Sequence, residues 1–94
     1  MELSNLQAAM RATYGDRDSS RGVDATFRWF TEEVGELARA IRTGDRANLE
    51  LEFSDVAAWI ASLANLLDVD LDEAVARYAT GCPKCHRRPC ACPP

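Results

Sequence analysis

Apolar side chains recur every three or four residues along most of this chain, which is the period of an α-helix. Near the N-terminus one face is formed by Leu3, Leu6, Met10, Thr13 and Tyr14. Because Ser4 and Gln7 also form the S-x-x-Q capping pattern, we predict a helix from Ser4 to about Tyr14. The polar segment 15–22 is predicted to be a loop. Its arginines, Arg21 among them, could lie over a phosphate, or the loop could be only a solvated connection.

Two longer helices are predicted next, from about Asp24 to Ile41 or Arg42 and from about Asn48 to Leu67, with a tight turn at 43–45 between them. The first has a narrow apolar arc of about 80°, formed by Phe27, Phe30, Val34, Leu37 and Ile41. The second carries no charge over residues 56–67. A helix that is apolar all round must be covered on every side. We therefore expect at least a homodimer, with these two helices at the interface.

The C-terminal part divides into a short helix and a cysteine-rich tail. Asp70, Asp72 and Glu73 form a further capping pattern, which predicts a fourth helix that ends near Tyr78 or Ala79. The fold class is accordingly all-α, a small bundle of about four helices that homo-oligomerisation completes. We assign residues 1–80 to the helical domain and residues 81–94 to the tail.

The most informative polar residues are four carboxylates: Glu33, Glu36, Glu52 and Asp55. Each predicted helix carries two of them three residues apart, and such residues share a helical face. Glu52 and Asp55 lie in the same arc as Val56 and Trp59, on the core side. Two carboxylates about 5 Å apart repel by about 3 kcal/mol at an effective dielectric constant near 20. Oxygen ligands without histidine or cysteine suit Mg²⁺ or Mn²⁺. Solvated acid pairs or arginine partners are the alternatives.

Composition and charge narrow the class of protein. The chain has 94 residues, 47% of them hydrophobic, which is typical of one globular domain. It contains no apolar run long enough to span a membrane and no signal-peptide pattern, so we expect a cytoplasmic protein. The first 76 residues have a net charge of −8 and the remaining 18 a net charge of +4. An acidic body argues against general nucleic-acid binding.

All four cysteines lie within 11 residues of the tail: Cys82, Cys85, Cys90 and Cys92. Cys-x-x-Cys followed by Cys-x-Cys could bind a structural Zn²⁺ through four thiolates, with His86 as an alternative ligand. A disordered tail and disulfides are the other interpretations, although a reducing cytoplasm disfavours disulfides.

The acidic residues also carry a resemblance to a known family. Glu33-x-x-Glu36, a spacer of 15 residues, and Glu52-x-x-Asp55 resemble the signature of MazG-type nucleotide pyrophosphohydrolases, in the all-α NTP pyrophosphatase superfamily. The flanking segments 32–38, 52–56 and 64–65 match as well, and the resemblance covers about residues 23–78. It implies a helical bundle that forms dimers or tetramers. It also implies Mg²⁺ bound by these acids, and hydrolysis of nucleoside triphosphates to monophosphate and pyrophosphate, with house-cleaning of the nucleotide pool as one role.

Other residues are then given provisional roles. One of the four carboxylates, or Glu32, would orient the attacking water. Trp29 is either a platform for the base or a packing residue, and Asn65 is either a polar core contact or a nucleotide contact. Relatives often supply a lysine to the phosphates, and here Arg77 would replace it. The rival hypothesis is a non-catalytic dimeric module that uses its tail to bind a partner.

Overall fold

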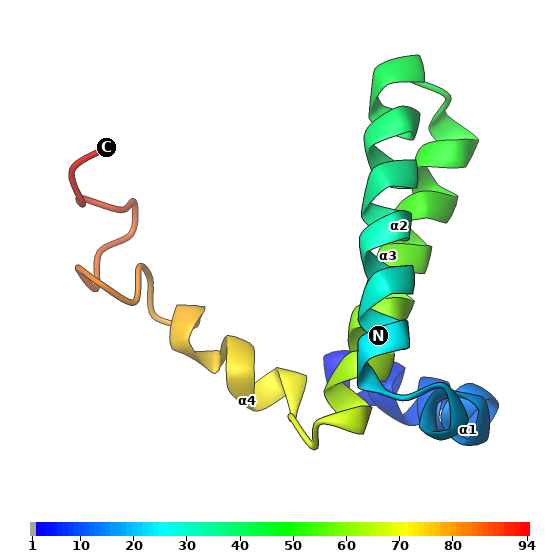
Figure 1. Cartoon of the computed structure of the whole chain (residues 1–94). Coiled ribbons are helices and arrows are strands. Elements are labelled where there is room, and N and C mark those ends of the chain that lie inside the picture. Colours follow the sequence, from blue (N-terminus) through cyan, green and yellow to red (C-terminus); the bar gives the residue numbers. More distant parts are fainter. Residues whose placement is uncertain (1) are drawn as a thin grey trace.

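The computed structural model describes residues 2–94, which are helical up to residue 78 and contain no strand. The elements are α1 (Leu3–Arg21), α2 (Val23–Thr43), α3 (Arg46–Leu66), α4 (Leu71–Val75) and the 3₁₀ turn η1 (Ala76–Tyr78). Helices α2 and α3 form a long antiparallel hairpin, and α1 lies across its base (Figure 1). The arm formed by α4, η1 and the tail extends to one side of the hairpin. The predicted all-α class is thus confirmed.

The hairpin turn follows directly from local sequence. Gly44 ends α2 with φ of 73°, in the left-handed region that favours glycine, and its N–H donates to Ala40 O at 2.9 Å. Asp45 then caps α3, because its Oδ1 accepts hydrogen bonds from Ala47 N and Asn48 N. The predicted turn at 43–45 is therefore correct.

The predicted loop at 15–22 is wrong, because α1 continues through it to Arg21. The packed face of this helix continues past Gly15 to Asp18. Asp18 is 4% exposed and pairs with Arg21 at 2.8 Å. The helix stops instead at Gly22, which has φ of 85° and donates its N–H to Asp18 O. Tertiary burial of this turn thus outweighs its loop-like composition.

The predicted capping box at Ser4 is also wrong. Helix α1 begins one residue earlier, at Leu3, and Gln7 turns its side chain toward the α3–α4 connection. Gln7 Oε1 accepts from Leu71 N at 2.9 Å, and Gln7 Nε2 donates to Val69 O at 2.7 Å. Gln7 is buried, so these partners satisfy polar groups that water cannot reach. Asn65 joins the same network through Gln7, as a polar packing contact between α1 and α3.

The fourth helix starts where the capping pattern predicts. Asp70 Oδ1 accepts from Asp72 N at 2.9 Å and Glu73 N at 3.4 Å. The helix is short, however, and its last turn is the 3₁₀ segment η1. Within the described residues, no helix is long and apolar enough to cross a bilayer.

Candidate metal centre and adjoining pocket

The seam between α2 and α3 places carboxylates where a hydrophobic core would otherwise lie. Thr26 and Ala40 are both 0% exposed, and Glu33 lies midway between them at spacings of seven residues. Residues seven apart share a helical face, so Glu33 projects into the seam and is half-buried. By contrast, Phe27 is 55% and Ile41 61% exposed. The apolar arc predicted to face the core therefore lies beside the seam, and the carboxylates occupy it.

Three of the four predicted carboxylates meet in this seam. Glu33, Glu52 and Asp55 each offer one oxygen, and these oxygens lie within 4.8 Å of one another. Glu33 and Glu52 are half-buried, whereas Asp55 is exposed, so the prediction that it lies on the core side is wrong. Glu52 Oε2 is buried and has no hydrogen-bond partner. A buried, unpartnered carboxylate oxygen costs several kcal/mol unless a cation or a proton satisfies it.

The electrostatics of the cluster are visible at Glu33. Desolvation raises the pKa of its carboxyl above the usual value, and the negative charges of Asp55 and Glu52 raise it further. A side-chain hydrogen bond with Glu52, which requires a proton on Glu33, acts in the same direction. Each of these causes disfavours the ionised form. A divalent cation between the oxygens would reverse the effect, because it favours the ionised form of every ligand.

Arginine does not neutralise this cluster. The two ion pairs found among residues 2–94 are Arg21–Asp18 and the exposed, longer Arg46–Glu50 pair, and neither includes a cluster carboxylate. The donor set is all carboxylate oxygen, on two rigid helices, with one buried oxygen unpartnered. These residues therefore fit a hard divalent cation such as Mg²⁺ or Mn²⁺.

Two further acids of α2, Glu36 and Glu32, are close to Glu33 in sequence. Glu36 is half-buried and is not one of the three grouped residues, although its charge also raises the pKa of Glu33. Glu32 is exposed and lies in a shallow hollow with Arg28 and Trp29.

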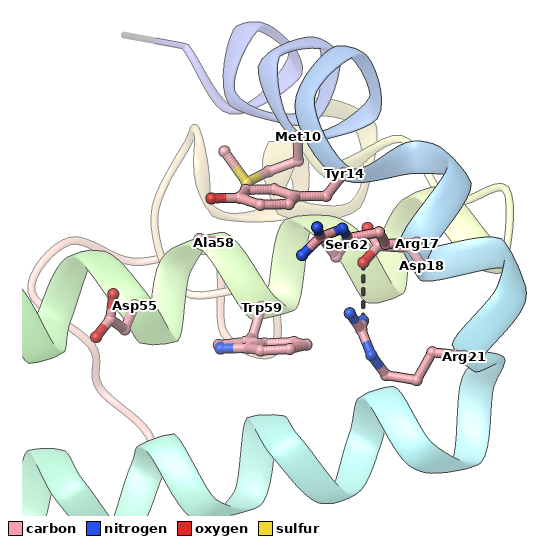
Figure 2. Close-up of a pocket in the computed structure, with 9 residues that line it drawn as sticks. All are labelled: Met10, Tyr14, Arg17, Asp18, Arg21, Asp55, Ala58, Trp59 and Ser62. Atoms are coloured by element: carbon pink, nitrogen blue, oxygen red, sulfur yellow. Dashed lines mark hydrogen bonds and ion pairs between the residues drawn. The ribbon is translucent and has the colours of Figure 1, made fainter.

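A pocket of about 300 Å³ adjoins the cluster through Asp55. Its other lining residues come from α1 and α3: Met10, Tyr14, Arg17, Asp18, Arg21, Ala58, Trp59 and Ser62. Figure 2 shows Met10 and Tyr14 extending from α1 over α3, and the Trp59 ring pointing from α3 toward α2. The pocket thus combines aromatic faces, two guanidinium groups and one carboxylate of the cluster.

Buried charge at one end of the pocket fixes its shape. Asp18 Oδ1 accepts from Arg21 Nη1 at 2.8 Å, while Asp18 Oδ2 is buried without a partner. The Arg21 guanidinium also lies 4.9 Å from the centre of the Trp59 ring, within cation–π range. On α2, Trp29 stacks on Trp59 with ring centres 6.1 Å apart.

The other predicted contact residues are placed differently. Arg21 lines the pocket, whereas Trp29 is half-exposed beside it and Asn65 binds Gln7 and Arg11. Arg77 lies in η1, on the arm that extends away from the hairpin, with its guanidinium over the Tyr78 ring (Figure 1). Sequence reasoning placed Tyr14 only on a packing face and placed Arg17 and Asp18 in a predicted loop, so it did not predict that these three residues line one pocket. The helical spacing of Met10, Tyr14, Arg17 and Arg21 is the signal that would have predicted the face of α1 that lines the pocket.

The tail brings its four cysteines together as a second cluster. One sulfur from each lies within 4.8 Å of the others, and all four are free thiols. Backbone N–H groups of Cys85 and Lys84 lower the pKa of the Cys82 thiol to about 6. Side-chain hydrogen bonds with Cys90, Cys82 and Cys85 raise the pKa of the Cys92 thiol to about 11. His86 is not one of the grouped residues.

The fold and the seam define an all-helical protein with a carboxylate site suited to hard divalent cations. The family model of the MazG nucleotide pyrophosphohydrolase domain matches residues 21–90, and the chain belongs to this family. Its general function is accordingly of the nucleotide pyrophosphohydrolase type. The resemblance drawn from the carboxylate spacing is confirmed. A search of curated proteins gave no match.

Proposed function

We propose that this protein is a Mg²⁺-dependent nucleoside triphosphate pyrophosphohydrolase that acts as a homodimer. The single observation that carries the proposal is the buried, unpartnered Oε2 of Glu52, beside carboxylates of Glu33 and Asp55. A seam made of carboxylates destabilises the apo hairpin, and a bound cation would remove that cost. Membership of the MazG family supplies the class of substrate.

The reaction is attack of water on the α-phosphorus, with formation of an oxygen–phosphorus bond and departure of pyrophosphate. Glu33, Glu52 and Asp55 would hold Mg²⁺, with Glu36 one helical turn from Glu33 as a further ligand. When bound, Mg²⁺ would offset the charge of the phosphate oxygens and lower the pKa of a bound water. A carboxylate of the cluster, or Glu32, would orient the attacking water and accept its proton.

The adjoining pocket is proposed to bind the nucleoside. It reaches the cluster at Asp55, so a phosphate chain near the carboxylates would place the nucleoside between α1 and α3. Both faces of Trp59 have neighbours, Arg21 and Trp29, whereas Tyr14 is 44% exposed. Tyr14 is therefore the better stacking platform.

The assay that tests the function is pyrophosphate release from a panel of ribo- and deoxyribonucleoside triphosphates with Mg²⁺, Mn²⁺ or EDTA. We expect metal-dependent release of pyrophosphate and monophosphate in equal amounts. Glu52→Gln should abolish it, whereas Glu50→Gln, on the exposed face of the same helix, should not. Silence across the panel with folded, Mg²⁺-loaded protein would contradict the proposal, and so would near-full activity of Glu52→Gln.

The nucleoside pocket has its own test. Tyr14→Ala should raise KM about 5- to 150-fold, because stacking of a base on an aromatic ring contributes about 1–3 kcal/mol. Thr13→Ala changes an exposed neighbour outside the pocket lining and serves as the control. Equal KM values for Tyr14→Ala and the wild type would place the nucleoside elsewhere.

The homodimer is supported by two apolar stripes on the hairpin. Along α2 the stripe is Phe27, Val34 and Ile41, and along α3 it is Phe53, Ile60 and Leu67 just after the helix; all six are 43–61% exposed. The residues of each stripe are seven apart, the spacing of helices that pack side by side. In each helix, the residues of the stripe come one position after residues that face the seam. Because the helices are antiparallel (Figure 1), both stripes face the same side of the hairpin.

A second copy is the occupant that best fits this face. Among residues 2–94, the buried hydrophobic side chains are Ala40, Ala61, Leu63 and Ala64, which is a small core. The same pair of stripes on a second hairpin would be self-complementary across a two-fold axis and would complete a four-helix bundle.

A further inference from the structure

The tail beyond η1 folds back on itself as a tight loop. Cys82 N donates to Arg87 O at 3.0 Å, and His86 N donates to Cys82 O at 2.7 Å. Gly81 has φ of 118°, and a Cβ at that position would lie only 3.0 Å from Arg87 O. The loop therefore requires glycine at its start, both for the backbone conformation and for the close approach of Arg87.

The four thiols converge inside this loop with the dimensions of a tetrahedral site. The sulfur atoms of Cys82 and Cys92 lie 3.7 Å apart, and those of Cys85 and Cys90 lie 4.0 Å apart. A Zn–S distance of about 2.3 Å gives a tetrahedral edge of about 3.8 Å. A disulfide would need sulfur atoms about 2.05 Å apart. The cluster thus has the size of a metal site with four sulfur ligands.

The surroundings of the sulfur atoms suit thiolates. Ala91 N donates to Cys85 Sγ and Cys92 N donates to Cys90 Sγ, both at 3.3 Å. Four thiolates around Zn²⁺ carry a net charge of −2, and the segment 77–94 contains four basic residues and no acid. Backbone donors and nearby cations both stabilise such a charge. By contrast, hard cations prefer the oxygen ligands of the hairpin seam.

We propose that Cys82, Cys85, Cys90 and Cys92 bind one structural Zn²⁺ and that this metal folds the tail onto the end of the helical arm. The residue that links the loop to the arm is Arg88, whose Nη2 donates to Ala79 O at 2.8 Å. A cation on a terminal carbonyl satisfies an acceptor that the last turn leaves free. Because four thiolates leave no open position for water, this zinc has no part in hydrolysis. The site is independent of the function proposed for the seam.

The first experiment measures metal content in full-length protein purified under reducing conditions without chelators. We expect about one zinc per chain, and less than about a tenth of that in Cys90→Ser. His86→Ala is the matched control, because His86 lies inside the loop but outside the sulfur cluster. Replacement by Co²⁺ should give sulfur-to-cobalt charge-transfer absorption in the wild type and in His86→Ala. Protein with four reduced thiols that binds neither metal would overturn the proposal, as would iron in place of zinc or loss of zinc in His86→Ala.

The second experiment tests folding of the tail by limited trypsin digestion, since Lys84, Arg87 and Arg88 lie in the loop. Zinc-loaded protein should resist cleavage after Lys84 at least tenfold longer than protein stripped by a zinc chelator, and added zinc should restore resistance. Equal cleavage rates would overturn the folding role. Pyrophosphate release by Cys90→Ser distinguishes the zinc site from the seam, because loss of zinc should leave this activity unchanged.

Discussion

At the scale of single residues, Glu52 carries the largest conflict between stability and function. Its Oε2 is buried without a partner beside two other carboxylates. In the absence of divalent ions, Glu52→Gln should therefore raise the free energy of unfolding by about 1–3 kcal/mol.

Added Mg²⁺ should raise the melting temperature of the wild type and leave that of the Glu52→Gln variant unchanged. Thermal melts with EDTA and with Mg²⁺ measure both, and Glu50→Gln should behave as the wild type. A melting temperature of the wild type that Mg²⁺ does not change would contradict a metal in the seam.

From the pKa of Glu33 we predict that the free energy of unfolding of the metal-free protein depends on pH. Desolvation and the neighbouring Asp55 and Glu52 raise its pKa in the folded state. The folded protein therefore holds this proton at pH values where the unfolded chain has lost it. Consequently the free energy of unfolding should fall as the pH rises from the unfolded pKa, about 4.3, through the raised folded pKa.

Urea unfolding of metal-free protein across this pH range, in the wild type and in Glu33→Gln, isolates the contribution. The difference between the two should grow with pH, with the wild type becoming the less stable. Parallel curves for the two proteins would contradict the raised pKa of Glu33.

The residues of the carboxylate cluster were predictable from sequence because their chemistry depends on local spacing. Glu52 and Asp55, three apart on α3, share a face, and the short turn at Gly44 brings α2 with Glu33 beside them. The same spacing also predicted Glu36, which is not one of the grouped residues, so spacing alone did not give the exact set. The pocket residues were not predictable in this way. Asp18 is buried and paired with Arg21, and nothing in its own segment distinguishes it from a solvated acid.

At the scale of elements, local sequence signals predict the turn of the hairpin but not the start of α1. The end of α2 and the start of α3 follow from Gly44 and Asp45, which act within one turn of the chain. The start of α1 and its continuation past Gly15 have partners far away in sequence: Gln7 binds the α3–α4 connection, and the buried Asp18 lines the same pocket as residues of α3. Only the end of α1, at Gly22, carries a local signal. Local signals for a cap and a loop therefore failed, because buried tertiary partners outweighed them.

The two glycines of the hairpin predict opposite effects of alanine. Gly44 has φ of 73°, so Gly44→Ala should lower the free energy of unfolding by about 1–2 kcal/mol. Gly35 lies in the interior of α2 with no atom within 4 Å of an added Cβ, so Gly35→Ala should raise it by about 1 kcal/mol. Urea midpoints at one fixed protein concentration measure both changes. A loss of stability in Gly35→Ala would show that another helix packs closely there, which the phase of the apolar stripes does not predict.

At the scale of the whole molecule, the hairpin needs a partner for its apolar face. Replacement of Ile60, which is 43% exposed at the middle of its stripe, by aspartate would bury an unpaired charge in the proposed interface. Because a two-fold dimer carries the substitution twice, a cost of about 3 kcal/mol per copy corresponds to a dissociation constant on the order of 10⁴-fold higher. Sedimentation equilibrium should therefore find a dimer or a larger even-numbered assembly for the wild type and a shift to monomer for Ile60→Asp.

Val75→Asp, at an equally exposed valine of α4 outside both stripes, should assemble as the wild type does. A monomeric wild type at micromolar concentration, or an unchanged assembly of Ile60→Asp, would contradict the two-fold packing of the stripes. Since each hairpin holds its own Glu33, Glu52 and Asp55, the monomeric variant also tests whether the carboxylate cluster binds Mg²⁺ without the second copy.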